Sequence, residues 1–256
     1  MSTDSAVTLR ATDDPTRRDW VAIYCAILGA FMAMMDIQIT NSSLKEIQGA
    51  LSATLEEGSW ISTSYLVAEI IMIPLTAWLT QLLSVRRLAV WITSGFMVSS
   101  VLCSLAWNLE SMIVFRALQG FSGGALIPLA FTLSYMKVPD RLRPKTMALF
   151  ALTATFAPSI GPTLGGWLTD NFGWEYIFYI NLPPALLMIA GLMYSLDREK
   201  PNWSLLKQTD YAGIVCMAIG LGCLQVFLEE GYRKDWLESS LIVTLGCIAF
   251  IALGLF

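Results

Sequence analysis

Apolar stretches of about twenty residues, separated by short polar runs, dominate this sequence. A helix of about twenty apolar residues crosses the hydrocarbon core of a bilayer, which is about 30 Å thick. Eight such stretches are predicted as spans: residues 20–40, 59–83, 88–107, 111–136, 147–168, 176–196, 211–228 and 239–256. The chain is therefore predicted to be an all-α polytopic membrane protein. No polar residue follows the last stretch, so we expect the chain to be cut inside its eighth span.

The composition supports this class and narrows the chemistry. Hydrophobic residues make up 55% of the chain and charged residues 14%, against about 25% charged in soluble domains. The five cysteines all lie in apolar stretches, without metal-ligand or disulfide spacing. Histidine is absent, so proton chemistry would have to use carboxylates. No nucleophile, metal or phosphate-loop pattern indicates an enzyme, and the small acidic excess does not suggest nucleic acid.

The basic residues of the connections are distributed unevenly between the two sides of the predicted membrane. One side holds Arg10, Arg17, Arg18, Arg86, Arg87, Lys137, Arg141, Arg143, Lys145, Arg198, Lys200 and Lys207, and the other holds Lys45, Arg233 and Lys234. Lys and Arg concentrate on the cytoplasmic side of membrane proteins. The asymmetry of twelve to three predicts a cytoplasmic tail at 1–19 and a cytoplasmic loop at 197–210.

A weak internal repeat relates the ends of the second and fifth spans. Segments 75–81 and 164–170 agree at four of seven positions, including a tryptophan. The two spans run in opposite directions in the predicted topology. This relation is typical of an inverted three-plus-three repeat, although a match this short between apolar helices also arises by chance.

Three ionisable residues lie within the predicted spans: Asp36, Glu69 and Arg116. A charge at mid-membrane costs on the order of 3 kcal/mol, so such residues are usually paired or functional. Their depths are similar, and we expect Arg116 to face Asp36 or Glu69. Glu69 is the better candidate for a proton carrier, and Tyr65 shares its face of a predicted wetted helix. The alternative is a static ion pair that only fixes helix register.

Four local patterns carry a resemblance to a known family. They are Asp36 with Ile39, Thr40 and Asn41; Arg116-Ala117-Leu118-Gln119-Gly120 with Gly124 and Pro128; the run 157–166; and the run 173–183. Together they resemble the drug:proton antiporters of the major facilitator superfamily, in particular the fourteen-span EmrB/QacA group. The resemblance implies a six-span amino-terminal bundle at 20–196 and two extra spans at 211–256, in a bacterial inner membrane.

The run in the fifth span has two interpretations. Ala157, Gly161 and Gly165 recur every four residues, which allows another helix backbone to approach closely, and Pro158 and Pro162 permit bending. Small residues at this spacing are often mere packing. With Gly166, however, the run resembles the antiporter signature believed to seal the cavity against proton leak. The resemblance also assigns Asn41, Gln119 and Gly120 to the cavity or its motifs.

The sequence departs from the family pattern in two loops. Family members carry a glycine and an acidic residue in the loop after the second span, where this chain has Ser84 and Gln81 before Arg86 and Arg87. The gating role of that loop is therefore in question. Lys45 replaces a proline that usually follows the first-span motif.

The resemblance implies export of amphipathic, often cationic compounds, driven by protons and without a further cofactor. It also implies a periplasmic adaptor protein and an outer-membrane channel as partners, beside membrane lipid. An exporter of one metabolite, such as a siderophore or fatty acid, is equally compatible with these motifs. A third possibility is a truncated, non-transporting fragment, because full-length relatives are roughly twice this length. An open reading frame encoding six more spans beyond the Phe256 codon would make this chain a fragment of a working exporter.

The topology makes a direct prediction. Single cysteines at Arg141 and Asn171, in a background without the native cysteines, lie on opposite sides of the membrane. In intact cells an impermeant maleimide should label Asn171→Cys and spare Arg141→Cys until the cells are opened. Labelling of Arg141→Cys from outside would contradict the predicted topology.

Overall fold

The computed structural model describes residues 14–256, and every regular element in this part of the chain is a helix. The long helices are α1 (Arg17–Ser42), α4 (Trp60–Leu83), α5 (Val85–Ser104), α6 (Leu109–Gly123), α7 (Leu126–Lys137), α8 (Arg143–Phe172), α10 (Leu182–Ser195), α11 (Tyr211–Glu230) and α12 (Ser240–Leu255). The short helices are α2 (Leu44–Ala50), α3 (Leu55–Gly58) and α9 (Tyr176–Tyr179), and the 3-10 turns are η1 (Asp140–Leu142), η2 (Trp203–Lys207) and η3 (Trp236–Glu238).

The predicted all-α membrane class is confirmed. The structure contains 7 helical segments long and apolar enough to cross a bilayer. The eighth predicted span, 239–256, forms a shorter apolar helix, α12, of 16 residues. Helix α1 begins earlier than the predicted residue 20, because Thr16 and Asp19 form a reciprocal capping box at its start. Part of the predicted tail, residues 1–13 with Arg10, lies outside the described residues.

Two predicted spans are interrupted rather than continuous. The fourth is divided between α6 and α7, and the sixth between α9 and α10. Proline removes the N–H that would bond to the carbonyl four residues earlier. Pro128 thus leaves the Gly124 carbonyl without its helical donor, and Pro183 and Pro184 do the same for Tyr179 and Ile180. The break between α6 and α7 therefore lies at the Gly124 carbonyl, and the break between α9 and α10 lies at the carbonyls of Tyr179 and Ile180.

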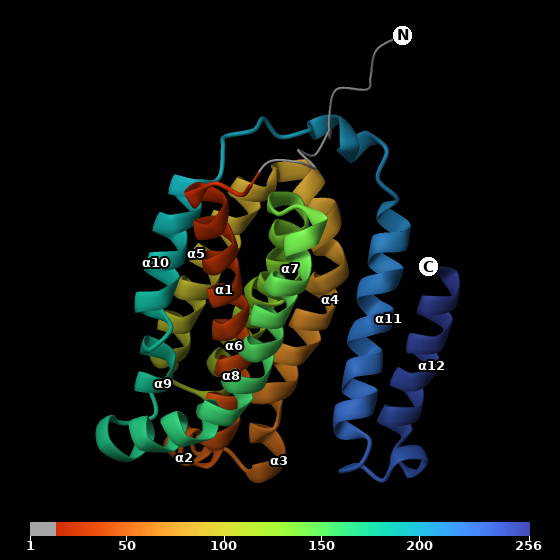
Figure 1. Ribbon diagram of the computed structural model, residues 1–256. Coiled ribbons are helices and arrows are strands. Elements are labelled where there is room, and N and C mark those ends of the chain that lie inside the picture. The colour runs from red at the N-terminus through yellow and green to blue at the C-terminus, as the bar shows by residue number, and fades with distance from the viewer. Residues whose placement is uncertain (1–13) are drawn as a thin grey trace.

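Helix α1 runs through the middle of the bundle and packs against α7, α8 and α10 (Figure 1). It contributes to two apolar clusters, one that includes Met32 and Ala33 and one that includes Met35 and Ile39. Asp36 therefore lies on α1 where the two clusters meet. Away from the bundle, α11 and α12 form a hairpin, and α11 lies against α4 (Figure 1).

A buried carboxylate attaches this hairpin to α4. Glu230, 1% exposed at the end of α11, accepts hydrogen bonds from Ser59 Oγ at 3.0 Å and Thr63 Oγ1 at 3.1 Å. The Arg233 guanidinium lies 3.7 Å from the same oxygen. At the other end of the seam, Trp78 Nε1 donates to Thr209 Oγ1 at 3.1 Å. Glu230 lies just outside the predicted span 211–228, and the sequence analysis assigned it no role.

The turn between α4 and α5 is strained at Ser84. This residue has φ 76° and ψ 153°, a region that side chains disfavour and glycine tolerates. Its hydroxyl is buried and has no hydrogen-bond partner among residues 14–256. Nearby contacts hold the turn in place: Arg86 Nη1 donates to Leu196 O at 2.8 Å, and Asn202 N donates to Leu82 O at 2.8 Å. Ser84 therefore keeps the backbone shape expected of the family glycine.

Replacing Ser84 with glycine should stabilise the protein. Ser84→Gly removes both the strained conformation and the unpaired hydroxyl, and we expect a gain of about 1 kcal/mol in the free energy of unfolding. Ser84→Ala is the matched control, since it removes the hydroxyl and keeps the strain. Thermal unfolding in detergent should rank glycine above alanine, and equal stabilities would show that the backbone conformation costs nothing.

Candidate functional site

The central feature of the site is a buried ion pair between α6 and α1. Arg116 Nη1 donates to Asp36 Oδ2 at 2.6 Å, and both side chains are 1% exposed. The sequence analysis expected Arg116 to face Asp36 or Glu69, and in the structure its partner is Asp36. Removing two charges from water costs several kcal/mol per ion, so the pair is stable only if the remaining polar atoms are also satisfied.

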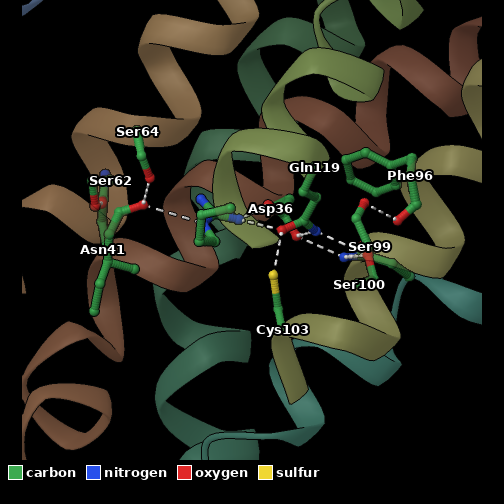
Figure 2. A network of polar contacts seen from close by, with 12 residues as sticks. Asp36, Asn41, Ser62, Ser64, Phe96, Ser99, Ser100, Cys103 and Gln119 are labelled. Carbon is green, nitrogen blue, oxygen red and sulfur yellow. Dashed lines mark hydrogen bonds and ion pairs between the residues drawn. The ribbon is translucent and has the colours of Figure 1, made fainter. Parts of the chain in front are cut away.

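Amide and hydroxyl groups from three further positions surround this pair, and Figure 2 shows two of them, Gln119 and Ser100, beside Asp36. Gln119 Nε2 donates to Asp36 Oδ1 at 2.9 Å and to Ser100 Oγ at 2.9 Å, while Gln119 Oε1 accepts from Arg116 Nη1 at 2.6 Å. Asn181 Nδ2 donates to the same Asp36 oxygen at 2.6 Å. Each oxygen of Asp36 therefore receives at least one hydrogen bond.

Aromatic rings and a backbone carbonyl enclose the guanidinium. The carbon Cζ of Arg116 lies 4.3 Å from the Tyr65 ring centroid and 5.9 Å from that of Phe178. Its Nε donates to the Ile61 carbonyl oxygen at 3.3 Å. The negative faces of aromatic rings attract a cation, and the attraction is stronger where water is excluded. Tyr65 is fully buried, so it supports Arg116 and does not form the wetted wall that the sequence suggested.

Glu69 lies one helical turn further along α4 from Tyr65 and is 7% exposed. Within the described part of the chain, its carboxylate makes no hydrogen bond or ion pair. An anion in the membrane interior is costly without a counter-ion. The two interior carboxyl groups thus have opposite surroundings: Asp36 is paired and Glu69 is not.

Of the other cavity residues expected from the resemblance, Asn41 lies at the edge of the molecule. Its Oδ1 accepts from Ser62 Oγ at 2.6 Å, and it lines a pocket of about 510 Å³ with Lys45 and Arg233. Gly120 has a packing role. A Cβ at Gly120 would collide with the backbone of Tyr65, so the glycine allows α6 to touch α4.

The small-residue run of the fifth span also packs against a backbone. Ala157, Gly161 and Gly165 of α8 are buried and face α1. A Cβ at Gly161 would lie 2.7 Å from Gln38 Cβ, and one at Gly165 would lie 2.9 Å from the Ile39 carbonyl oxygen. The other members of the run lie elsewhere: Pro158 and Pro162 are more exposed, and a Cβ at Gly166 would meet open space.

Two residues of the site were missed by the sequence analysis. Ser100 was given no role, and Asn181 appeared only within the pattern at 173–183. A polar residue followed by two prolines in an apolar stretch was the one available signal for Asn181, because a helix interruption needs polar groups to satisfy it.

Comparison with known proteins now places this geometry in a family. The model of the Major Facilitator Superfamily matches residues 26–256. The chain belongs to the major facilitator superfamily. The fold agrees: a D-xylose–proton symporter has a TM-score of 0.61 at 14% identity, covering 91% of this chain and 66% of the other.

Curated relatives of this facilitator chain are bacterial resistance and export proteins. The "Colistin resistance protein EmrB" of Acinetobacter baumannii is 44% identical, over 88% of this chain and 44% of its own. The "Fatty acid resistance protein FarB" of Neisseria gonorrhoeae is 37% identical, over 93% and 46%. The "Multidrug export protein EmrB" of Escherichia coli is 35% identical, over 88% and 44%. The chain thus spans less than half the length of these relatives.

The contact between α8 and α1 leads to a paired prediction. Gly161→Leu inserts a side chain where no space exists, which should force the helices apart and destabilise this facilitator chain by about 1–3 kcal/mol. Gly166→Leu is the matched control, because its side chain enters open space one turn away. Thermal unfolding of both variants in detergent tests the contact, and equal losses of stability would show that the α8–α1 approach is not tight.

Proposed function

We propose that this chain takes part in the proton-coupled export of amphipathic drugs or other toxic compounds across the bacterial inner membrane. The proposal rests on one observation. The Tyr65 ring lies 4.3 Å from Cζ of Arg116 in the sealed Asp36–Arg116 ion pair, and one turn further along α4 is Glu69, a carboxyl group without a partner among the described residues. The names of the relatives at 35–44% identity point to the same class of activity. Membrane lipid and a small amphipathic substrate are the ligands that this activity requires.

Competition for one carboxyl group can couple the proton to the substrate. Burial favours the neutral acid, and a nearby positive charge favours the anion. A cationic substrate that approaches Glu69 would therefore expel its proton, and substrate release would allow proton uptake. The membrane potential supplies about 2.3 kcal/mol per charge per 100 mV, enough for a roughly fiftyfold gradient. Protons are the only coupling ion this scheme needs.

The orientation and partners are part of the same proposal. The start of α1, the 137–145 connection and η2 all lie at one end of the bundle, with α2 and α3 at the opposite end (Figure 1). The positive-inside rule places the former end, with the amino terminus, in the cytoplasm. A periplasmic adaptor protein and an outer-membrane channel would then receive the exported compound.

Export of a specific metabolite remains the second candidate, because one relative is named for fatty acid resistance. That relative is 37% identical, against 44% for the colistin resistance protein, so export of toxic compounds is preferred. Competition assays with a fatty acid and a cationic drug would distinguish the two.

The decisive measurement is substrate-induced proton release from the detergent-solubilised protein, followed against pH. Glu69→Gln fixes the neutral state and should abolish the release while leaving the fold intact. Asp36→Asn should weaken both release and substrate binding, because Arg116 loses its counter-ion. Arg116→Ala should be worse than either, with a loss of stability of about 3–5 kcal/mol from the carboxylate it leaves unpaired.

The outcomes separate the possible carriers. Normal release from Glu69→Gln would remove Glu69 from the mechanism and leave Asp36 as the carrier. Normal release from the Asp36→Asn, Glu69→Gln double variant would refute proton coupling through this part of the chain. Loss of stability without loss of release would favour a static ion pair.

A further inference from the structure

A pocket of about 510 Å³ lies at the end of the bundle that holds α2 and α3 (Figure 1). Its walls come from three parts of the chain: the end of α1 with α2, helix α3, and the turn between α11 and α12. Pockets of about 300–1,000 Å³ are the usual size for binding a small molecule. Neither the Asp36–Arg116 pair nor Glu69 lines this pocket, so it is separate from the site described above.

Two basic side chains of this pocket have unused hydrogen-bond donors. Lys45, where the sequence departs from the family pattern, makes no ion pair or hydrogen bond within residues 14–256. Arg233 makes no hydrogen bond in the same part of the chain, and its Nη1 lies 3.7 Å from Glu230 Oε1, beyond hydrogen-bond distance. The acid on the pocket wall, Glu56, is bound to Lys234 Nζ at 2.6 Å. Among these residues the pocket therefore presents two cations and an acid that is already paired.

A buried amide lies on the same wall as Lys45. Gln48 follows Lys45 by three residues on α2, so the two side chains share a face of the helix. Gln48 is 5% exposed and makes no hydrogen bond within residues 14–256. A Cβ at Gly58 would lie 2.2 Å from Gln48 Nε2, so this glycine leaves space for the amide against α3. Buried polar groups are usually hydrogen-bonded, and an oxyanion in the pocket would supply the missing acceptor.

The pocket lies at the level where the membrane spans end. Around it α1 ends at Ser42, α4 begins at Trp60 and α11 ends at Glu230. Trp236 in the hairpin turn is 39% exposed, and tryptophan is enriched at the level of the lipid headgroups. Leu55, which is 76% exposed, adds an apolar surface to the pocket wall. Cationic donors beside an apolar surface at this depth fit a phosphate that carries acyl chains better than a free anion.

We propose that this pocket binds the phosphate group of an anionic membrane lipid, with Lys45 and Arg233 as its charged donors and Gln48 as a neutral one. Arginine presents a planar fork of N–H groups that matches phosphate oxygens, and lysine adds a second positive charge. Lys45 belongs to the six-span bundle and Arg233 to the hairpin of α11 and α12, so one bound phosphate joins the two. The inference does not depend on the proposed export function.

Thermal unfolding of the protein in a non-ionic detergent tests the site. Dioctanoyl phosphatidylglycerol, a short-chain anionic lipid, should raise the midpoint of unfolding in a saturable way, because a ligand that binds only the folded protein stabilises it. Lys45→Gln breaks no ion pair or hydrogen bond within residues 14–256 and should weaken the apparent affinity about tenfold. Lys45→Arg keeps the charge and should retain most of the affinity. The Lys45→Gln, Arg233→Gln double variant should lose the shift.

Controls separate binding in this pocket from general attraction to charge. Lys207→Gln removes a positive charge at the opposite end of the bundle and should leave the affinity unchanged. Dioctanoyl phosphatidylcholine, which has no net charge, and inorganic phosphate, which has no acyl chains, should each give a much smaller shift. Native mass spectrometry should count one fewer retained phosphatidylglycerol in Lys45→Gln than in Lys45→Arg.

Three results would overturn the inference. The first is an equal affinity for phosphatidylglycerol in wild type and Lys45→Gln. The second is an equal shift with phosphatidylcholine, which would show that the two basic residues do not select the headgroup. The third is an equal shift with inorganic phosphate, which would make the pocket a site for a free anion.

Discussion

The buried positive charge of Arg116 is the constraint on which the surrounding structure depends. A guanidinium that is 1% exposed cannot give up its proton and has no water to solvate it. Four groups surround it instead of water. They are the Asp36 carboxylate on α1, the Gln119 amide oxygen on α6, and the Ile61 carbonyl and the Tyr65 ring on α4. These partners come from three helices, so satisfying one charge fixes their relative rotation. A hydrophobic core alone would not specify this register, because apolar faces slide past each other at low cost.

Close backbone approaches make these contacts possible. Gly120 on α6 and Gly124 just after it approach the backbone of α4 at Tyr65 and Glu69. Gly161 and Gly165 bring α8 against α1. In lipid no hydrophobic force drives helices together, so such close packing and the interior hydrogen bonds supply the association energy. The same helices therefore carry both the packing residues and the ionisable groups. A movement of one glycine contact would change the distance between the charges directly.

The sequence predicted the parts that depend on the composition of single segments. The apolar stretches, the interior position of Asp36, Glu69 and Arg116, and the small-residue run of the fifth span follow from local patterns, and the structure contains each of them. The sequence did not predict which face of each helix turns toward the protein interior, because the lipid and the protein interior are both apolar. The contacts of Asn181 and Ser100 depend on that rotation. The burial of Glu230 depends on which helix α11 packs against, and the sequence of α11 does not indicate its partner.

The carboxylate of Glu230 has a consequence for how the hairpin of α11 and α12 can move. It is joined to Ser59 and Thr63 at one end of α4, and at the other end the Trp78–Thr209 bond joins α4 to the connection just before α11. Separating them would break both hydrogen bonds to this buried carboxylate. Helices α4 and α11 are therefore expected to move as one rigid unit, so that a tilt of α4 within the bundle also tilts the hairpin. Tyr65 and Glu69 lie on α4 between the two attachments, so a movement of α4 that displaces them would displace the hairpin as well.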